Sequence, residues 1–115
     1  YMVDIDQIRV SDMVLDIGKK TIKDFAENIK NAKLIIWNGP LGYTENDLFE
    51  DGSKKLLQAI IASTAKIIIG GGETVELVQR LDMQDDIDFM STGGGAMLTY
   101  LQGDRLLALE KLKGE

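Results

Sequence analysis

A strand that stops at three glycines, with a helix beginning at once, is the feature that most constrains the fold of this chain. Residues 65–69 are mostly apolar and β-branched, Gly70-Gly71-Gly72 follows, and an amphipathic segment with an acidic first turn begins at Glu73. This order predicts a buried strand, a tight turn and a helix N-terminus. Residues 88–98 repeat the layout around Gly93-Gly94-Gly95. Glycine allows close approach to the unpaired N–H groups of a first helical turn, so each turn is suited to hold a phosphate.

Strands alternate with helices along the rest of the chain, which predicts βαβ units and a parallel sheet. Residues 33–38 are apolar on both faces, as is typical of a central parallel strand covered by helices on each side. Residues 3–10 alternate only loosely and are either a strand or an exposed lead-in. The predicted strands otherwise span residues 13–15, 33–38, 65–69 and 87–90, and the predicted helices span residues 21–32, 53–63, 73–81 and 96–101, before a last amphipathic segment around 106–112.

Three loops follow predicted strands and therefore lie at strand carboxyl ends: residues 38–45, 70–74 and 91–95. In parallel α/β sheets, ligands bind at this end of the strands. We expect the three loops to lie along one rim and to build one site together.

The chemistry of this rim is open to more than one interpretation. Neither glycine turn completes the dinucleotide fingerprint, because Val75 and Leu98 occupy the third glycine positions. Glu73 either complements the dipole of its helix or holds Mg²⁺, directly or through water, beside a polyphosphate. Glu45 is either a solvated loop acid or an acceptor for ribose hydroxyls. Tyr43 either lines an adenine or covers apolar core residues.

Composition excludes several classes of function. The 115 residues contain no cysteine and no histidine, which excludes thiolate and imidazole metal ligands and nucleophiles. The net charge of −6 argues against a nucleic-acid or anionic-membrane partner. Apolar runs are far shorter than a transmembrane helix and no signal peptide is visible, so we expect a soluble, cytoplasmic protein. Neither glycine turn contains a lysine or arginine, although phosphoryl transfer needs cations beside the moving phosphate.

Four motifs occur together in the order and spacing seen in phosphoglycerate kinases: residues 16–21 (DIGKKT), 37–42 (WNGPLG), 70–74 (GGGET) and 91–96 (STGGGA). From about residue 11 to residue 112, the chain resembles the last part of that family's C-terminal, nucleotide-binding domain. The resemblance implies a three-layer αβα, Rossmann-like fold with a parallel sheet. It also implies phosphoryl transfer between 1,3-bisphosphoglycerate and ADP in glycolysis, with ATP/ADP and Mg²⁺ bound.

The resemblance implies a role for residues of each loop. Those that resemble the adenosine pocket are Asn38, Pro40, Gly42 and Tyr43, and Glu45 resembles the ribose-binding glutamate. Those that match the segment meeting the nucleotide phosphates and the metal are Gly71, Gly72, Glu73 and Thr74, and those that match the turn facing the transferred phosphoryl group are Gly93, Gly94 and Gly95. The family usually has aspartate where Glu73 stands; the carboxylate is kept, and with the extra methylene it would hold Mg²⁺ directly or through water.

Other parts of the family's enzyme have no counterpart here. The missing parts are the N-terminal lobe that binds the acidic sugar substrate and the first half of the nucleotide-binding domain, which carries phosphate-contacting lysines. We therefore expect residues 1–115 to be a single partial domain that is catalytically inactive alone. The alternatives are a non-catalytic nucleotide- or anion-binding module and a structural fragment whose glycine turns bind nothing.

Overall fold

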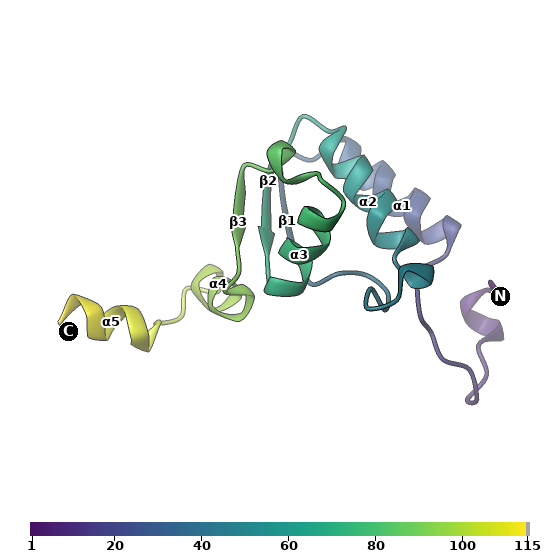
Figure 1. Cartoon of the computed structure of the whole chain (residues 1–115), viewed down its shortest axis with the longest axis horizontal. Coiled ribbons are helices and arrows are strands. Elements are labelled where there is room, and N and C mark those ends of the chain that lie inside the picture. Colours follow the sequence, from purple (N-terminus) through teal and green to yellow (C-terminus); the bar gives the residue numbers. More distant parts are fainter. Residues whose placement is uncertain (115) are drawn as a thin grey trace.

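The predicted parallel sheet is present, and the α/β class is confirmed. The structure is a computed structural model that describes residues 1–114. Its strands are β1 (Leu34–Asn38), β2 (Lys66–Gly70) and β3 (Phe89–Ser91), paired in parallel in the order β1-β2-β3. Helix α2 (Asp51–Ile61) connects β1 to β2, and α3 (Gly72–Arg80) connects β2 to β3 (Figure 1). The two βαβ units predicted between residues 33 and 90 are therefore confirmed.

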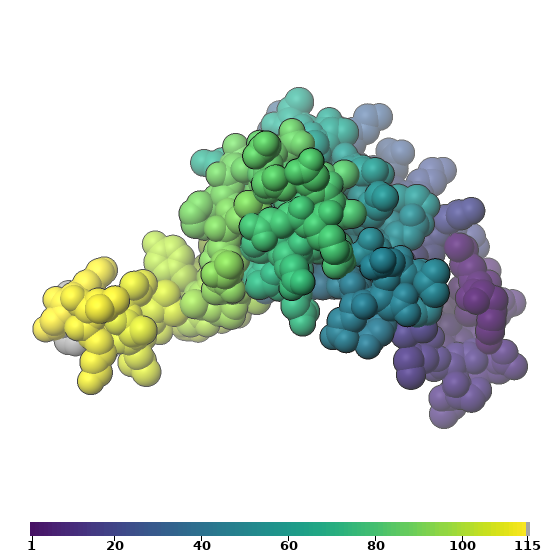
Figure 2. All heavy atoms as spheres, in the orientation of Figure 1, coloured from purple at the N-terminus to yellow at the C-terminus, as the bar shows by residue number. Residues whose placement is uncertain are grey.

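The remaining helices flank this core. Helix α1 (Lys19–Lys30) precedes β1 and packs beside α2, α4 (Gly94–Leu101) follows β3, and α5 (Leu107–Lys113) ends the described chain. Short 3-10 turns are η1 (Ile5–Gln7), η2 (Asp47–Phe49) and η3 (Gln84–Asp86). Helix α5 stands away from the body at the opposite end from the N-terminus, as the ribbon and the space-filling view both show (Figures 1 and 2). Within residues 1–114, none of the helices has the length and apolarity needed to cross a membrane.

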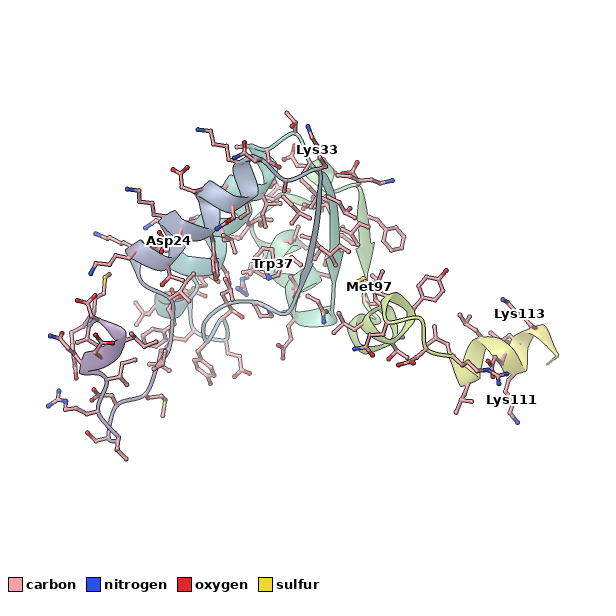
Figure 3. All side chains as sticks on the ribbon, turned by 180° about the vertical axis from the view of Figure 1, so that it is seen from behind. Asp24, Lys33, Trp37, Met97, Lys111 and Lys113 are labelled. Atoms are coloured by element: carbon pink, nitrogen blue, oxygen red, sulfur yellow. The ribbon has the colours of Figure 1, made fainter. Side chains whose placement is uncertain are left out.

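The hydrophobic core lies between one face of the sheet and helices α2 and α3. Leu57 of α2, Ile69 of β2 and Val78 of α3 are completely buried. Full burial of one such side chain stabilises the fold by about 1.5–3 kcal/mol. Trp37 pairs with Ile69 in the ladder and points into the same interior (Figure 3). The buried core comprises Trp37, Leu56, Leu57, Ile60, Ile67, Ile69, Val75, Leu77 and Val78.

The prediction that residues 33–38 form a central strand covered on both faces is wrong for the described chain. Strand β1 lies at the edge of the sheet, and Leu34 and Ile36 are 53% and 40% exposed. Ile36 pairs with Ile68, which pairs with the exposed Phe89, so the three share the sheet face opposite the core. An apolar run shows that a strand is suited to burial on both faces. It does not show whether the helices that would cover both faces lie within the described residues.

The predicted strand at residues 13–15 is also absent from the described structure. Met13 and Val14 are 79% and 68% exposed in an irregular segment that pairs with no strand. Leu15 instead accepts a backbone hydrogen bond from Tyr43 N (2.8 Å). Of the two interpretations of residues 3–10, the exposed lead-in is correct, and it contains η1. Short apolar stretches become strands only where a neighbouring strand offers hydrogen bonds.

The first motif of the sequence has a structural role. The Asp16 carboxylate accepts hydrogen bonds from Gly52 N (2.9 Å) and from Ile17 N (2.7 Å). Gly52 is in the first turn of α2, whose preceding residue, Glu50, makes no side-chain cap. Asp16 therefore caps α2 from a distant part of the chain, where its negative charge also complements the helix dipole.

We predict that Asp16→Ala lowers the free energy of unfolding by about 1–2 kcal/mol, because a first-turn N–H of α2 loses its acceptor. Chemical denaturation followed by circular dichroism measures this loss. The matched control is Asp24→Ala on α1 (Figure 3), an exposed position where the change is expected to stay within about 0.5 kcal/mol. Equal effects of the two substitutions would contradict the capping role.

Candidate functional site

The three loops predicted to share one rim do meet at the carboxyl ends of the strands. In Figure 1 this is the lower edge of the sheet, where α3 and α4 begin. The loops surround an open cavity of about 340 Å³. Its lining residues are Asn38, Gly39, Pro40, Gly71, Gly72, Glu73, Thr74, Thr92, Gly94 and Gly95.

The two glycine turns touch each other directly. Gly71 N donates to the carbonyl oxygen of Ser91 (2.8 Å), which ties the first turn to the end of β3. Gly71 has a φ of 94°, a backbone conformation that residues with a side chain rarely adopt. A Cβ atom on Gly94 would lie 2.7 Å from Gly71 Cα and 2.4 Å from Asn38 Oδ1. Glycine is thus required where the three strand ends converge.

The loop after β1 is joined to α3 by buried polar groups. The hydroxyl of Thr74, which is completely buried, accepts a hydrogen bond from Gly39 N (2.9 Å). The Trp37 indole donates from Nε1 to the Gly39 carbonyl oxygen (2.6 Å). Both bonds fix the first residues of this loop against the sheet. Thr74 therefore has a structural contact as well as a place in the cavity lining.

Two helix N-termini open into the cavity. The first intrahelical bonds are Val75 N to Gly71 O (3.0 Å) in α3 and Met97 N to Gly93 O (2.9 Å) in α4. The N–H groups before Val75 and before Met97 in each first turn therefore lack an acceptor inside their own helix. Cβ atoms added to Gly72 or Gly95 would meet nothing within 4 Å, so both turns are open toward a ligand. These donors and the helix dipoles suit a polyphosphate.

The cavity offers one carboxylate and, among the described residues, no basic side chain in its lining. Glu73 is exposed in the first turn of α3. No group of three or more possible metal ligands occurs within residues 1–114. Mg²⁺ usually takes one or two carboxylates and completes its shell with phosphate oxygens and water. The site therefore fits a Mg²⁺ ion that arrives with a polyphosphate and does not fit a metal held by protein alone.

Most residues predicted for the site line this cavity, and four do not. The residues outside the lining are Gly42, Tyr43, Glu45 and Gly93. Gly42 lies against the carbonyl groups of Leu15 and Phe49. Two lining residues, Gly39 and Thr92, were not among the predictions, although both lie inside motifs that pointed to the site. Their position between predicted residues was the signal available in the sequence.

Tyr43 and Glu45 form a pair further along the first loop. Tyr43 is 48% exposed. The Glu45 carboxylate raises the pKa of the Tyr43 phenol above 10.0, first as its hydrogen-bond acceptor and then as a negative charge that disfavours the phenolate.

Comparison with known proteins identifies what the chain is similar to. The family model described as phosphoglycerate kinase matches residues 1–104. The phosphoglycerate kinase of Wigglesworthia glossinidia brevipalpis is 44% identical over 109 residues, which cover 95% of this chain and 28% of that protein. The phosphoglycerate kinase of Francisella philomiragia is 44% identical over 102 residues, which cover 89% of this chain and 26% of that protein. The chain thus spans little more than a quarter of the length of these relatives.

Solved structures support the same similarity and confirm the Rossmann-like fold class. A phosphoglycerate kinase structure from Coxiella burnetii superposes with a TM-score of 0.83 at 35% identity, over 89% of this chain and 27% of that one. A structure from Pyrococcus horikoshii OT3 gives a TM-score of 0.78 at 36% identity, over 88% and 25%.

We predict that Gly94→Ala lowers the free energy of unfolding by about 1–3 kcal/mol, because the new methyl group overlaps Gly71 and Asn38. Gly95→Ala is the matched control, since its methyl group enters open space in the same helical turn. We expect the control to be neutral or slightly stabilising, since alanine favours helix over glycine by up to about 1 kcal/mol. Denaturation curves of both variants decide whether close packing at Gly94 exists.

We predict that Glu45→Gln lowers the pKa of Tyr43 toward 10.0, because the negative charge is removed and the remaining amide oxygen is a weaker acceptor than a carboxylate. Absorbance titration of the phenolate, with Tyr1 and Tyr100 replaced by phenylalanine, isolates this group. In the unsubstituted protein, the pair stabilises the fold below pH 10.0, and this contribution is lost as the pH rises through the higher folded-state pKa. Glu27→Gln on α1 is the control, and an identical titration for the two variants would refute the pairing.

Proposed function

Since the chain belongs to the phosphoglycerate kinase family, we propose that it is the ATP/ADP-binding portion of such an enzyme. The whole enzyme would transfer a phosphoryl group between 1,3-bisphosphoglycerate and ADP in glycolysis. Residues 1–115 would be one partial domain, the C-terminal portion of the nucleotide-binding lobe, and the chain would act in the cytoplasm. We propose that it has no nucleic-acid or membrane partner, because its net charge is −6.

One observation carries this proposal: two helix N-termini and one carboxylate face a single cavity at the carboxyl ends of three parallel strands. The first turn of α3, with Gly71, Gly72 and Thr74, would seat the nucleotide phosphates by backbone N–H donors. The turn Gly93-Gly94-Gly95 would face the transferred phosphoryl group. The first loop would bind the nucleoside, with Asn38, Pro40, Gly42 and Tyr43 beside the adenosine and Glu45 at the ribose hydroxyls.

Glu73 is the proposed metal ligand, directly or through water. Mg²⁺, when bound, neutralises phosphate charge and orients the phosphate oxygens. Without the metal, the Glu73 carboxylate would repel a polyphosphate in the same cavity. Its placement beside the helix N-terminus therefore makes binding depend on the metal and the nucleotide together.

The absence of lysine and arginine from the described lining limits what this chain can do alone. Helix N-termini supply partial charges, which seat a phosphate, but transfer of a phosphoryl group needs full positive charges beside it. We propose that these charges, and the binding of 3-phosphoglycerate or 1,3-bisphosphoglycerate, come from parts of the enzyme outside residues 1–115. The same observation favours the second candidate, a module that binds a nucleotide or anion without chemistry.

We predict that Mg·ADP raises the melting temperature of the chain by mass action, and that Glu73→Gln weakens Mg·ADP binding several-fold. With EDTA in place of Mg²⁺, the same substitution is expected to leave ADP binding unchanged or to strengthen it, because the repulsion is removed. Isothermal titration calorimetry measures both arms. Glu76→Gln is the control, since Glu76 is exposed on the same helix but does not line the cavity.

The two candidate functions, a portion of a kinase and a binding module without chemistry, predict different results in an activity assay. We predict no turnover above background for the purified chain in a coupled assay of 1,3-bisphosphoglycerate formation. Addition of the complementary part of a related phosphoglycerate kinase is expected to restore turnover if the chain is a kinase portion. Turnover by the chain alone would contradict the proposed division of charges, and failure to bind Mg·ADP would contradict the nucleotide site.

A further inference from the structure

One guanidinium group joins the end of α3 to the loop that follows β1. Arg80, the last residue of α3, forms an ion pair with Glu50 and donates from Nη2 to the Thr44 carbonyl oxygen (3.4 Å). The Glu50 side chain is 14% exposed and that of Arg80 is 41% exposed. An ion pair with one shielded partner is screened less by solvent and salt than an exposed pair.

The two contacts of Arg80 lie on either side of η2. Before η2, the chain turns at Tyr43, whose carbonyl oxygen accepts from Asn46 N (3.2 Å). After η2, Glu50 enters α2, and its carbonyl oxygen accepts from Lys54 N (2.9 Å). Arg80 therefore ties the turn that contains Thr44 to the start of a core helix. Tyr43 directly precedes Thr44 in this turn, and Glu45 directly follows it.

Helix α3 thereby reaches both halves of the candidate site. Glu73 and Thr74 are in its first turn and line the cavity. Leu77 and Val78 are buried in the core, so the helix is fixed relative to the sheet. Arg80 at the other end of α3 contacts the loop through Thr44 and Glu50. A rigid helix thus sets the position of the loop relative to the phosphate turn.

We propose that Arg80 is a positioning residue for the nucleoside half of the site: its joint contact with Glu50 and Thr44 holds Tyr43 and Glu45 in the conformation that a nucleoside meets. This inference rests on the proposed function. The gain in affinity is entropic, because a loop that is already ordered in the free protein loses little conformational entropy when the ligand binds. Phosphate binding at the two glycine turns, which Arg80 does not contact, should not depend on Arg80.

The test compares a ligand that has a nucleoside with one that lacks it. Calorimetry of Mg·ADP and of Mg·pyrophosphate is performed on the chain and on Arg80→Ala. We expect Mg·ADP to bind about 2- to 10-fold more weakly to the variant, as expected for one or two side chains that must be ordered on binding. The affinity for Mg·pyrophosphate should change less than about twofold, since the phosphate turns do not contact Arg80.

Two further variants separate positioning from folding. Glu50→Gln is also expected to weaken the binding of Mg·ADP. The loss of binding free energy in the double variant should be smaller than the sum of the two single losses, because the residues act through one contact. Lys55→Ala is the matched control: it also removes a cation from an ion pair, with Asp51, but on the surface of α2. It should leave both ligands unaffected.

Amide hydrogen exchange at residues 44–48 gives a readout that needs no ligand. Exchange should be faster in Arg80→Ala than in the parent chain, and unchanged in Lys55→Ala. The inference is overturned if Arg80→Ala loses affinity equally for Mg·ADP and Mg·pyrophosphate, or if it loses affinity for neither. If the parent chain binds neither ligand, the proposed nucleotide site fails, and unchanged exchange in Arg80→Ala would then separately overturn the role of Arg80.

Discussion

The close contact between the two glycine turns is the constraint on which the rest of the site depends. Gly71 N donates to Ser91 O at 2.8 Å, and the space beside Gly94 is already filled by Gly71 and by Asn38 Oδ1. Any side chain at Gly94 would separate α4 from α3. Because these turns meet without side chains between them, both helix N-termini face the same small volume and their partial charges act on one ligand.

The groups around this cavity supply partial positive charges and one carboxylate. The cavity lining contains backbone donors and Glu73, and within residues 1–114 it contains no basic side chain. This arrangement agrees with a chain that spans little more than a quarter of the length of its relatives. The sheet face around Ile36 and Phe89 is also uncovered within residues 1–114, and its apolar side chains are exposed.

Contacts distant in sequence hold the loop after β1 and the start of α2 in place. Asp16 caps α2 through Gly52, and the Tyr43 backbone bonds to Leu15. Arg80 joins α3 to the loop after β1. None of these groups is part of the cavity lining, but the loop after β1 and helix α3, which Arg80 joins, both contribute lining residues. The conformation of the first loop is therefore a property of the packed domain and not of its own sequence.

The sequence alone determined the strand–turn–helix units, because β-branched runs, glycine turns and helical spacing are local signals. It also determined that residues 38–45, 70–74 and 91–95 share one rim, since parallel strands place their carboxyl ends together. Only the tertiary structure decided that Leu34 and Ile36 are exposed, that residues 13–15 form no strand, and that Arg80 contacts the loop. The physical reason is that edge position, strand pairing and ion pairing depend on partners far away in the chain, which periodicity does not encode.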